Sequence, residues 1–291
     1  MRSAGVTIEL DTRTRLCGVI GNPVEHSLSP AIHNAAFRKA GLNFVYLAFP
    51  VETIGDALKG IRALGNSRGF SVTIPHKVAA MPFLDEVDQT AQHIGAVNTV
   101  VVENGKLIGY NTDASGALRA LQENGAALLG QRALVLGSGG AARAIAFALA
   151  ADAQIAGLTI LGVDEAERRR LVQDLRSRTG LAVEDGPIQD DAMRSWIPHC
   201  RTVIHCTPVG MFPHVDETCV PAGMWRSDLT VMDVVYNPRE TRLLKEAKAA
   251  GCRTIQGIEM FLNQAILQFE LWTNQSAPAD VMRAVLESRF Q

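Results

Sequence analysis

Cysteine pairs, long apolar runs and excess charge of one sign are all lacking in this 291-residue chain. Its 5 cysteines are odd in number and form no CxxC pair, which argues against a disulfide framework or a zinc knuckle. We expect them to be buried thiols in a reducing compartment. No stretch approaches the roughly 20 apolar residues of a membrane span, and the first residues lack the apolar core of a signal peptide. These absences predict a cytoplasmic protein without a membrane partner.

Charge is nearly balanced, since 28 Lys and Arg face 30 Asp and Glu, for a net charge of -2. A chain without a basic excess has no electrostatic footprint for nucleic acid. His26, His33, His76 and His205 show no metal-ligand spacing such as HExxH, so no metal is predicted and each is interpreted as a packing or loop residue. The expected partner is a small-molecule substrate, and the expected assembly is a monomer or homodimer.

The first part of the chain alternates between strand and helix patterns. The patterns are strands at 16–20, 43–50 and 69–74, helices at 30–40 and 54–64, and a hairpin over 96–110 with an Asn104-Gly105 turn. Short strands that alternate with helices and end in a hairpin predict an α/β domain with a mixed sheet.

A second α/β pattern follows a helix at 111–124. Its elements are strands at 132–136, 157–161, 202–206 and 230–235 and helices at 165–178 and 240–250, and helices at 259–272 and 279–290 close the chain. This alternation predicts a doubly wound, Rossmann-type domain. We therefore place one domain at 1–112 and the second at 113–257, and expect the helices of 258–291 to pack back on the first.

A glycine turn follows the strand at 132–136 and precedes an apolar helix. It reads Gly137-Ser138-Gly139-Gly140-Ala141. A strand, glycine turn and helix present helix N–H groups to a pyrophosphate, which predicts dinucleotide binding. The motif departs from GxGxxG, because Ala142 takes the place of the third glycine. A tight turn that only packs a helix on a sheet is the alternative.

The end of the next strand of this domain carries acids and no arginine, over residues 161–165. In doubly wound folds an acid at this end binds the adenosine ribose, whereas an arginine accommodates the 2′-phosphate of NADP. A carboxylate about 6 Å from that phosphate weakens binding by on the order of 1 to 5 kcal/mol. Asp164 or Glu165 could face the ribose, which favours NAD over NADP. The alternative is that Arg168 or Arg169 reaches the phosphate.

Several longer motifs run along nearly the whole chain. They are GNPVEHSLSPAIHN at 21–34, VTIPHK at 72–77, GAVNT at 95–99, GYNTD at 109–113, VLGSGGAAR at 135–143, TPVGM at 207–211, YNPRETRLL at 236–244 and GIEM with Gln264 at 257–264. In sequence, order and spacing the chain closely resembles the shikimate dehydrogenase family, which includes shikimate/quinate dehydrogenases. The resemblance covers about Gly18 to Pro278.

The resemblance implies a reversible NAD(P)-dependent reduction of 3-dehydroshikimate to shikimate in aromatic amino acid biosynthesis, with a first domain that binds substrate. It implies that Lys77 and Asp113 form the catalytic pair, which holds and releases the hydroxyl proton. For the substrate it implies Ser27 and Ser29 at the carboxylate, Thr73, Asn98 and Gln264 at ring hydroxyls, and Tyr236 as an aid. For the cofactor it implies Gly137, Ser138, Gly139, Gly140, Ala141, Asp164, Thr207, Pro208 and Gly257.

The chain departs from the family pattern at three places. Ser71 stands where the family usually has Asn, both arginines of the NADP enzymes' NRTxxR stretch are missing, and His205-Cys206 precede TPVGM where Asn is frequent. Quinate is the alternative substrate to shikimate. A ligand-binding sensor without turnover is the alternative to an enzyme. The intact Lys77 and Asp113 favour an enzyme, because a pure binder has no use for a proton-transfer pair.

Overall fold

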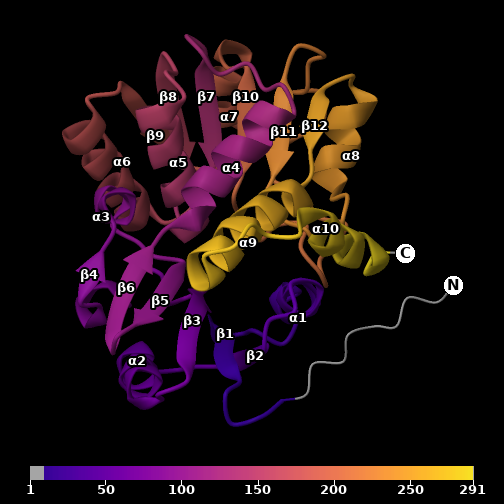
Figure 1. Ribbon diagram of the computed structural model, residues 1–291. Helices are drawn as coiled ribbons and strands as arrows, with labels where there is room; N and C mark the ends of the chain where they lie inside the picture. The colour runs from indigo at the N-terminus through magenta and orange to yellow at the C-terminus, as the bar shows by residue number, and fades with distance from the viewer. Residues whose placement is uncertain (1–9, 291) are drawn as a thin grey trace, which may run out of the picture. The chain divides into compact units, whose positions relative to one another are not determined.

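The computed structural model describes residues 10–290, which divide into two compact units. The first unit ends at Thr112 and resumes at Gln264, and the second runs Asp113–Asn263. Each contains one six-stranded sheet (Figure 1). The predicted domain ends at residues 1 and 291 lie outside the described residues, and the roles assigned to the two domains stay predictions.

The sheet of the first unit is mixed, as predicted. Its strands are β1 Arg15–Gly21, β2 Phe44–Pro50, β3 Ser67–Val72, β4 Glu86–Val87, β5 Thr99–Glu103 and β6 Lys106–Tyr110, in the order β2-β1-β3-β5-β6-β4. Its helices are α1 Ser29–Lys39, α2 Ile54–Ala63 and α3 Gln89–Ile94, with a 3-10 turn at Met81–Phe83. β1 pairs in parallel with β2 and β3, and β5 runs antiparallel to β3 and β6.

The predicted hairpin is formed by β5 and β6. Asn104 has a φ of 51° and Gly105 a φ of 78°. Two successive positive φ values are the requirement of the tight hairpin turn for which Asn-Gly is preferred. The turn chemistry in the sequence therefore set the register of this pair.

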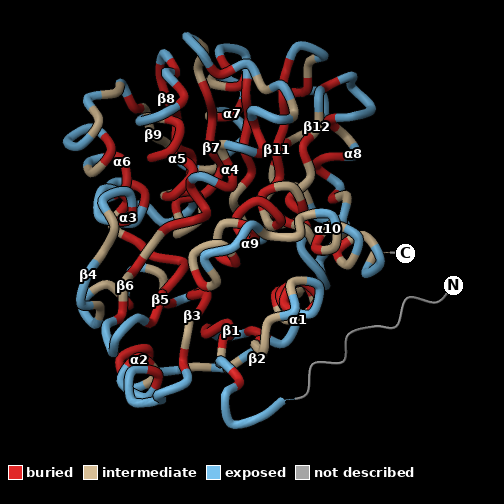
Figure 2. The backbone as a smooth tube through the Cα atoms, in the orientation of Figure 1, coloured by how far each residue is buried: buried red, intermediate tan, exposed pale blue. Residues whose placement is uncertain are grey.

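The core of the first unit lies along the central strands, which are drawn as buried in Figure 2. In β1 every residue from Cys17 to Gly21 is buried, as expected of a strand that pairs on both sides. At Gly69 in β3 a Cβ atom would lie 2.0 Å from a ring carbon of Trp272, which is fully buried. The indole fits against the sheet because Gly69 has no side chain.

Gly69→Ala is expected to destabilise the protein by about 2 kcal/mol, because the added methyl displaces the Trp272 ring from the core. The midpoint of urea unfolding measures the change. Gly60→Ala is the matched control, since a Cβ at this exposed position of α2 meets nothing within 4 Å and alanine favours the helix. Equal midpoints for the two variants would contradict the packing argument.

The sheet of the second unit is parallel throughout, as predicted for a doubly wound domain. Its strands are β7 Arg132–Leu136, β8 Gly157–Leu161, β9 Val183–Gly186, β10 Thr202–His205, β11 Thr230–Asp233 and β12 Arg253–Ile255, in the order β12-β11-β10-β7-β8-β9. Its helices are α4 Thr112–Glu123, α5 Gly140–Asp152, α6 Glu165–Thr179, α7 Asp190–Trp196 and α8 Arg242–Ala249, with a 3-10 turn at Ile197–His199. The strand order reverses between β7 and β10.

The closing helices are α9 Gly257–Thr273 and α10 Ala279–Ser288. Within the first unit, α10 packs against α1, and the Trp272 indole donates a hydrogen bond to the Val100 carbonyl at 3.1 Å. No helix among residues 10–290 has both the length and the apolar character that crossing a membrane requires.

The five cysteines are all free thiols, and not all of them are buried as expected. Cys17, Cys200 and Cys252 lie in the interior, but Cys206 and Cys219 are partly exposed. Cys206 directly follows strand β10. Cys219 lies in the long segment between β10 and β11, outside the sheet.

Candidate active site

Ser27 and Ser29 lie where the chain enters α1. The Ser27 hydroxyl accepts a hydrogen bond from the Ser29 backbone N–H at 3.3 Å. Ser29 is 5% exposed, and its side chain interacts with the Tyr46 hydroxyl. The two hydroxyls are thereby held beside the first N–H groups of a helix, an arrangement that suits an anion.

The loop that carries Thr73 and Lys77 is held by backbone hydrogen bonds at both ends. The Thr73 N–H donates to the Ile20 carbonyl at 3.0 Å, and the Val97 N–H donates to the Lys77 carbonyl at 2.9 Å. The Thr73 and Lys77 side chains are partly buried. The motifs around Lys77 and Asn98, 21 positions apart in the sequence, are therefore adjacent in the first unit.

The carboxamide of Asn98 has one determined orientation. Its Oδ1 accepts hydrogen bonds from the Thr112 N–H at 2.7 Å and from the Thr99 hydroxyl at 2.8 Å. A backbone N–H can only donate, so the oxygen must face Thr112. One hydrogen of Nδ2 is taken by the Thr112 hydroxyl at 3.0 Å. Asn98 can therefore offer a ligand one further N–H donor, and it does not offer both donor and acceptor.

A buried chain of hydrogen bonds supports this orientation. The Tyr46 hydroxyl donates to Ser71 Oγ at 2.7 Å, and Ser71 donates to Gln268 Oε1 at 2.9 Å. Gln268 Nε2 donates to the Thr99 hydroxyl at 2.9 Å, and Thr99 donates to Asn98. Each hydroxyl in the chain donates to the next member, which fixes the orientation of the Asn98 carboxamide. Tyr46 and Gln268 had no signal in the sequence, and Ser71 stood out only because it departs from the family pattern.

Gln264 lies one helical turn before Gln268 on α9. Residues four apart share a face of a helix, so Gln264 is on the face that meets the Asn98 network. It is 7% exposed. The network thus links Asn98 to Gln268 and Tyr46, and Tyr46 interacts with Ser29.

Two further predicted residues lie in the second unit. Asp113 is in the first turn of α4, directly after Thr112, and is 6% exposed. An acid in the first turn of a helix is favoured by the helix dipole. Tyr236 is partly buried, its ring centroid lies 4.7 Å from that of Phe261, and burial raises its pKa.

The glycine turn has the geometry that a dinucleotide phosphate needs. Gly137 follows β7 with a φ of 117°, and a Cβ there would lie 3.0 Å from the Cys206 carbonyl oxygen. Glycine is thus required by conformation and by close approach. At Gly139, the N-cap of α5, a Cβ would meet nothing within 4 Å, and no side chain caps the helix. Gly140 and Ala141 begin α5, so the turn fits a bound pyrophosphate.

The acidic turn after β8 lies beside the glycine turn. Asp164 is the N-cap of α6, where its side chain accepts the Glu167 N–H at 2.8 Å, and the Glu167 carboxylate accepts the Ser138 hydroxyl at 2.8 Å. Arg168 is 7% exposed and donates to Asp185 and to the Gly162 carbonyl.

Arg169 lies at the surface, where it pairs with Glu165 at 2.6 Å. Arg168 and Arg169 were the two candidates for binding the 2′-phosphate of NADP. Of these, Arg168 is bonded within the protein interior.

Thr207 and Pro208 follow β10, and Gly257 begins α9. The Thr207 hydroxyl accepts the Val209 N–H at 3.3 Å. The Cys206 N–H donates to the Leu136 carbonyl at 2.7 Å, so this loop lies beside the end of β7. A Cβ at Gly257 would lie 2.5 Å from the Val235 carbonyl oxygen, and this packing alone requires glycine there.

Comparison with known proteins gives a consistent result. The profile of the shikimate dehydrogenase substrate binding domain matches residues 19–100, and that of the shikimate 5'-dehydrogenase C-terminal domain matches residues 257–287. A relative from Methanopyrus kandleri, shikimate dehydrogenase (NADP(+)), is 46% identical over 97% of this chain and 98% of its own. The chain belongs to the shikimate dehydrogenase family.

Two further members of the family agree. The shikimate dehydrogenase (NADP(+)) of Moorella thermoacetica is 46% identical over 96% of this chain and 95% of its own. The crystal structure of shikimate 5-dehydrogenase from Listeria monocytogenes, in complex with shikimate and NAD, has a TM-score of 0.89 and 38% identity, and covers 97% of this chain and 99% of its own. The family membership therefore extends over both units.

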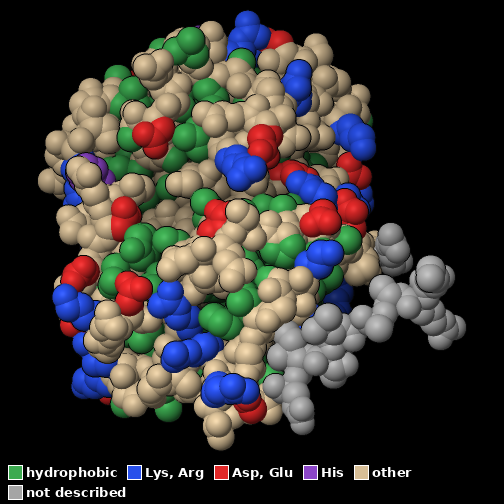
Figure 3. Space-filling model, in the orientation of Figure 1, with side chains coloured by type: hydrophobic (Ala, Val, Ile, Leu, Met, Phe, Trp, Pro, Cys, Tyr) green, Lys and Arg blue, Asp and Glu red, His purple; other side chains and the backbone are tan. Residues whose placement is uncertain are grey.

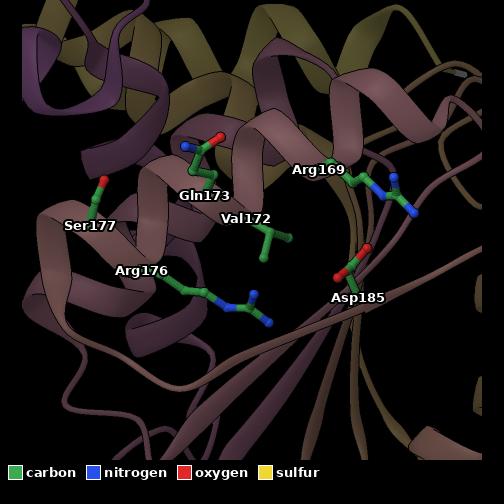
Figure 4. A pocket seen from close by; sticks show the side chains of 6 residues that line it. All are labelled: Arg169, Val172, Gln173, Arg176, Ser177 and Asp185. Atoms are coloured by element: carbon green, nitrogen blue, oxygen red, sulfur yellow. The ribbon is translucent and has the colours of Figure 1, made fainter.

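One groove of the second unit lies away from the residues that the family pattern identifies. It has a volume of about 570 Å³ and lies between α6 and β9, with Arg169, Val172, Gln173, Arg176, Ser177 and Asp185 as its lining (Figure 4). Arg176 Nε donates to the Val183 carbonyl at 3.0 Å. With Arg169 paired to Glu165, the arginines of this groove serve the fold of α6.

Acidic and basic side chains are interspersed on the face shown in Figure 3. Within residues 10–290, no group of three His, Cys, Asp or Glu side chains is arranged to hold a metal ion.

Proposed function

We propose that this chain is an NAD(P)-dependent shikimate dehydrogenase that interconverts 3-dehydroshikimate and shikimate. The observation that carries the proposal is 46% identity to a shikimate dehydrogenase over 97% of the chain. In the first unit a hydrogen-bond network links Tyr46, Ser71, Gln268 and Asn98, and Tyr46 also interacts with Ser29. A cytoplasmic location and a monomeric or dimeric assembly remain predictions.

The first unit is proposed to bind the substrate. Ser27 and Ser29 bind its carboxylate beside the start of α1, as two hydroxyls and helix N–H groups suit an anion. Thr73 and Gln264 bind ring hydroxyls, with Tyr236 as an aid from the second unit. Asn98 donates its remaining N–H to a ring hydroxyl oxygen, because its own oxygen is already occupied.

The second unit is proposed to bind the cofactor. The glycine turn Gly137 to Ala141 holds the pyrophosphate, Asp164 faces the adenosine ribose, and Thr207, Pro208 and Gly257 lie toward the reacting end. Bound NAD(P) supplies the hydride acceptor and donor. Lys77 and Asp113 hold the hydroxyl proton of the substrate and release it during oxidation.

Absorbance at 340 nm tests the activity, with shikimate and quinate each offered with NAD and with NADP. Turnover of shikimate supports the proposal, and faster turnover of quinate would assign the chain to the alternative ring. Absence of turnover with all four pairs, together with ligand-induced thermal stabilisation, would refute the enzyme and favour a sensor.

The cofactor preference is open to a specific test. The names of the Methanopyrus and Moorella relatives favour NADP and give no support to the predicted NAD preference. The acids of the turn after β8 favour NAD, because a carboxylate near a 2′-phosphate repels it. We propose that the chain uses NAD(P) and that Asp164 weakens its affinity for NADP.

Asp164→Asn is expected to improve the KM for NADP about tenfold relative to that for NAD, the lower end of the range because Asp164 is exposed. Asparagine keeps the N-cap of α6 while it removes the charge. Asp88→Asn makes the same change at the N-cap of α3 and is the matched control. An unchanged NADP to NAD ratio in Asp164→Asn would show that Asp164 does not face the ribose.

A further inference from the structure

A buried pair of ionisable side chains ends two neighbouring strands of the second sheet. His205 ends β10 and Asp233 ends β11, and the two are register partners on these parallel strands. Their side chains are 1% and 0% exposed. His205 Nδ1 lies 2.9 Å from Asp233 Oδ1, and Nε2 is hydrogen-bonded to the Thr207 hydroxyl. The spacing of the histidines had predicted only a packing residue here.

The partners of Asp233 determine which nitrogen of His205 carries a hydrogen. Asp233 Oδ1 also accepts the Val235 N–H at 3.0 Å, and Oδ2 accepts the Thr241 hydroxyl at 2.6 Å. Since a carboxylate oxygen only accepts, His205 Nδ1 must be the donor to Asp233. Nε2 is therefore the nitrogen whose protonation varies, and it faces Thr207.

The protonation of Nε2 decides what Thr207 can offer to a ligand. The Thr207 hydroxyl has one hydrogen, and its oxygen already accepts the Val209 N–H. When Nε2 is bare, the hydroxyl hydrogen is donated to the imidazole. When Nε2 carries a hydrogen, the imidazolium donates to the oxygen and the hydroxyl hydrogen is directed outward. His205 thus converts Thr207 from an acceptor into a donor.

The surroundings of His205 favour the imidazolium. Burial lowers its pKa, but the hydrogen bonds with Asp233 and Cys219 outweigh that effect and raise the pKa to about 9. The other titratable neighbour among the described residues is Cys206, whose pKa is raised by burial, so it remains a neutral thiol. At neutral pH the Thr207 hydroxyl is therefore a donor.

Thr207 lies where a nucleotide is expected in this sheet. The strand order reverses between β7 and β10, and ligands of doubly wound sheets bind beyond the carboxyl ends of the strands at such a switch point. We propose that His205 is a positioning residue for the cofactor, which directs the Thr207 hydroxyl as a hydrogen-bond donor to an acceptor oxygen of bound NAD(P). This inference rests on the proposed function.

Titration calorimetry with NAD and with NADP, between pH 7 and pH 10.5, tests the inference without turnover. In the wild type the Kd of the better cofactor is expected to rise about tenfold as the pH passes about 9, since one hydrogen bond is lost. His205→Asn keeps an amide donor for Asp233 but carries no titrating ring. Its Kd is expected to be about tenfold higher at pH 7 and flat with pH.

Thr207→Val removes the hydroxyl and leaves the His205 and Asp233 pair in place, so it serves if His205→Asn fails to fold. It is expected to show the same weak, pH-independent binding. Exposed His199→Asn is the control that keeps the wild-type profile. A rise in Kd near pH 9 that persists in either Thr207→Val or folded His205→Asn would overturn the inference. Failure of the wild type to bind either cofactor at any pH would refute the proposed function itself.

Discussion

Lys77→Ala is expected to lower kcat for shikimate oxidation by about 10²- to 10⁴-fold, because it removes one member of the pair that holds the hydroxyl proton. The loop around Lys77 keeps its backbone hydrogen bonds, since the Val97 N–H is bonded to the Lys77 carbonyl and not to the side chain. Binding of the cofactor by the second unit is expected to be unchanged. Steady-state kinetics at saturating cofactor measure the loss in kcat, and calorimetry measures the cofactor Kd.

Lys59→Ala is the matched control, because Lys59 lies on α2 with a side chain that is 77% exposed and pairs with Asp56 at 3.8 Å. Asp113→Asn is expected to cause a loss comparable to that of Lys77→Ala. If the two groups act as a unit, the double variant loses little more than either single variant. A Lys77→Ala enzyme within about threefold of the wild-type kcat would refute the assigned pair, whereas additive losses would assign Lys77 and Asp113 to separate steps.

The long, periodic elements of the fold were predictable from the sequence. The strand, glycine turn and helix at β7 and α5 and the Asn-Gly hairpin at β5 and β6 are confirmed, because each depends on local patterning and turn chemistry. Short elements were missed. They are α3, β4, β9, α7 and β12, each of 2 to 7 residues. In segments this short, the spacing of apolar residues does not distinguish a helix from a strand.

The position of β9 at the edge of its sheet explains why this strand was missed. It reads Val-Glu-Asp-Gly, and only Val183 is buried. Charged side chains on an edge strand oppose pairing with another chain, but they also remove the apolar signal of a strand. β3 was placed two residues late for a similar reason, as Ser67 and Arg68 begin it with polar side chains.

The sequence predicted which residues form the candidate site, but it did not predict the hydrogen bonds between them. Asn98 was identified from its motif, yet the use of its oxygen depends on Thr112, and its support comes from Gln268, 170 positions further along. His205 had no signal beyond its departure from the family pattern. Its role emerges only when β10 and β11 bring Asp233 beside it. Pairings between distant elements are properties of the tertiary structure, which periodicity does not contain.

A second large effect is expected from His33 as the pH falls. This α1 residue is 0% exposed, and its ring stacks on Tyr46 with centroids 4.7 Å apart. Among residues 10–290, no hydrogen-bond partner lies within bonding geometry of either ring nitrogen. Burial lowers its pKa to about 3, a shift that the nearby Gln268 side chain partly opposes. The folded pKa thus lies below the unfolded value of about 6.5.

A depressed histidine pKa stabilises the fold fully above pH 6.5, and this stability is lost as the pH falls toward 3, because the unfolded chain then binds a proton that the folded chain excludes. The loss is about 3 kcal/mol by pH 4. Urea unfolding of the ligand-free protein at pH 7, 5.5 and 4 measures it. His33→Leu is expected to remove that part of the acid loss, whatever its stability at pH 7, whereas exposed His93→Leu keeps it. An acid loss of the same size in His33→Leu and the wild type would mean that His33 is protonated in the fold, and the aromatic contacts of Tyr46 would then have to accommodate a buried cation.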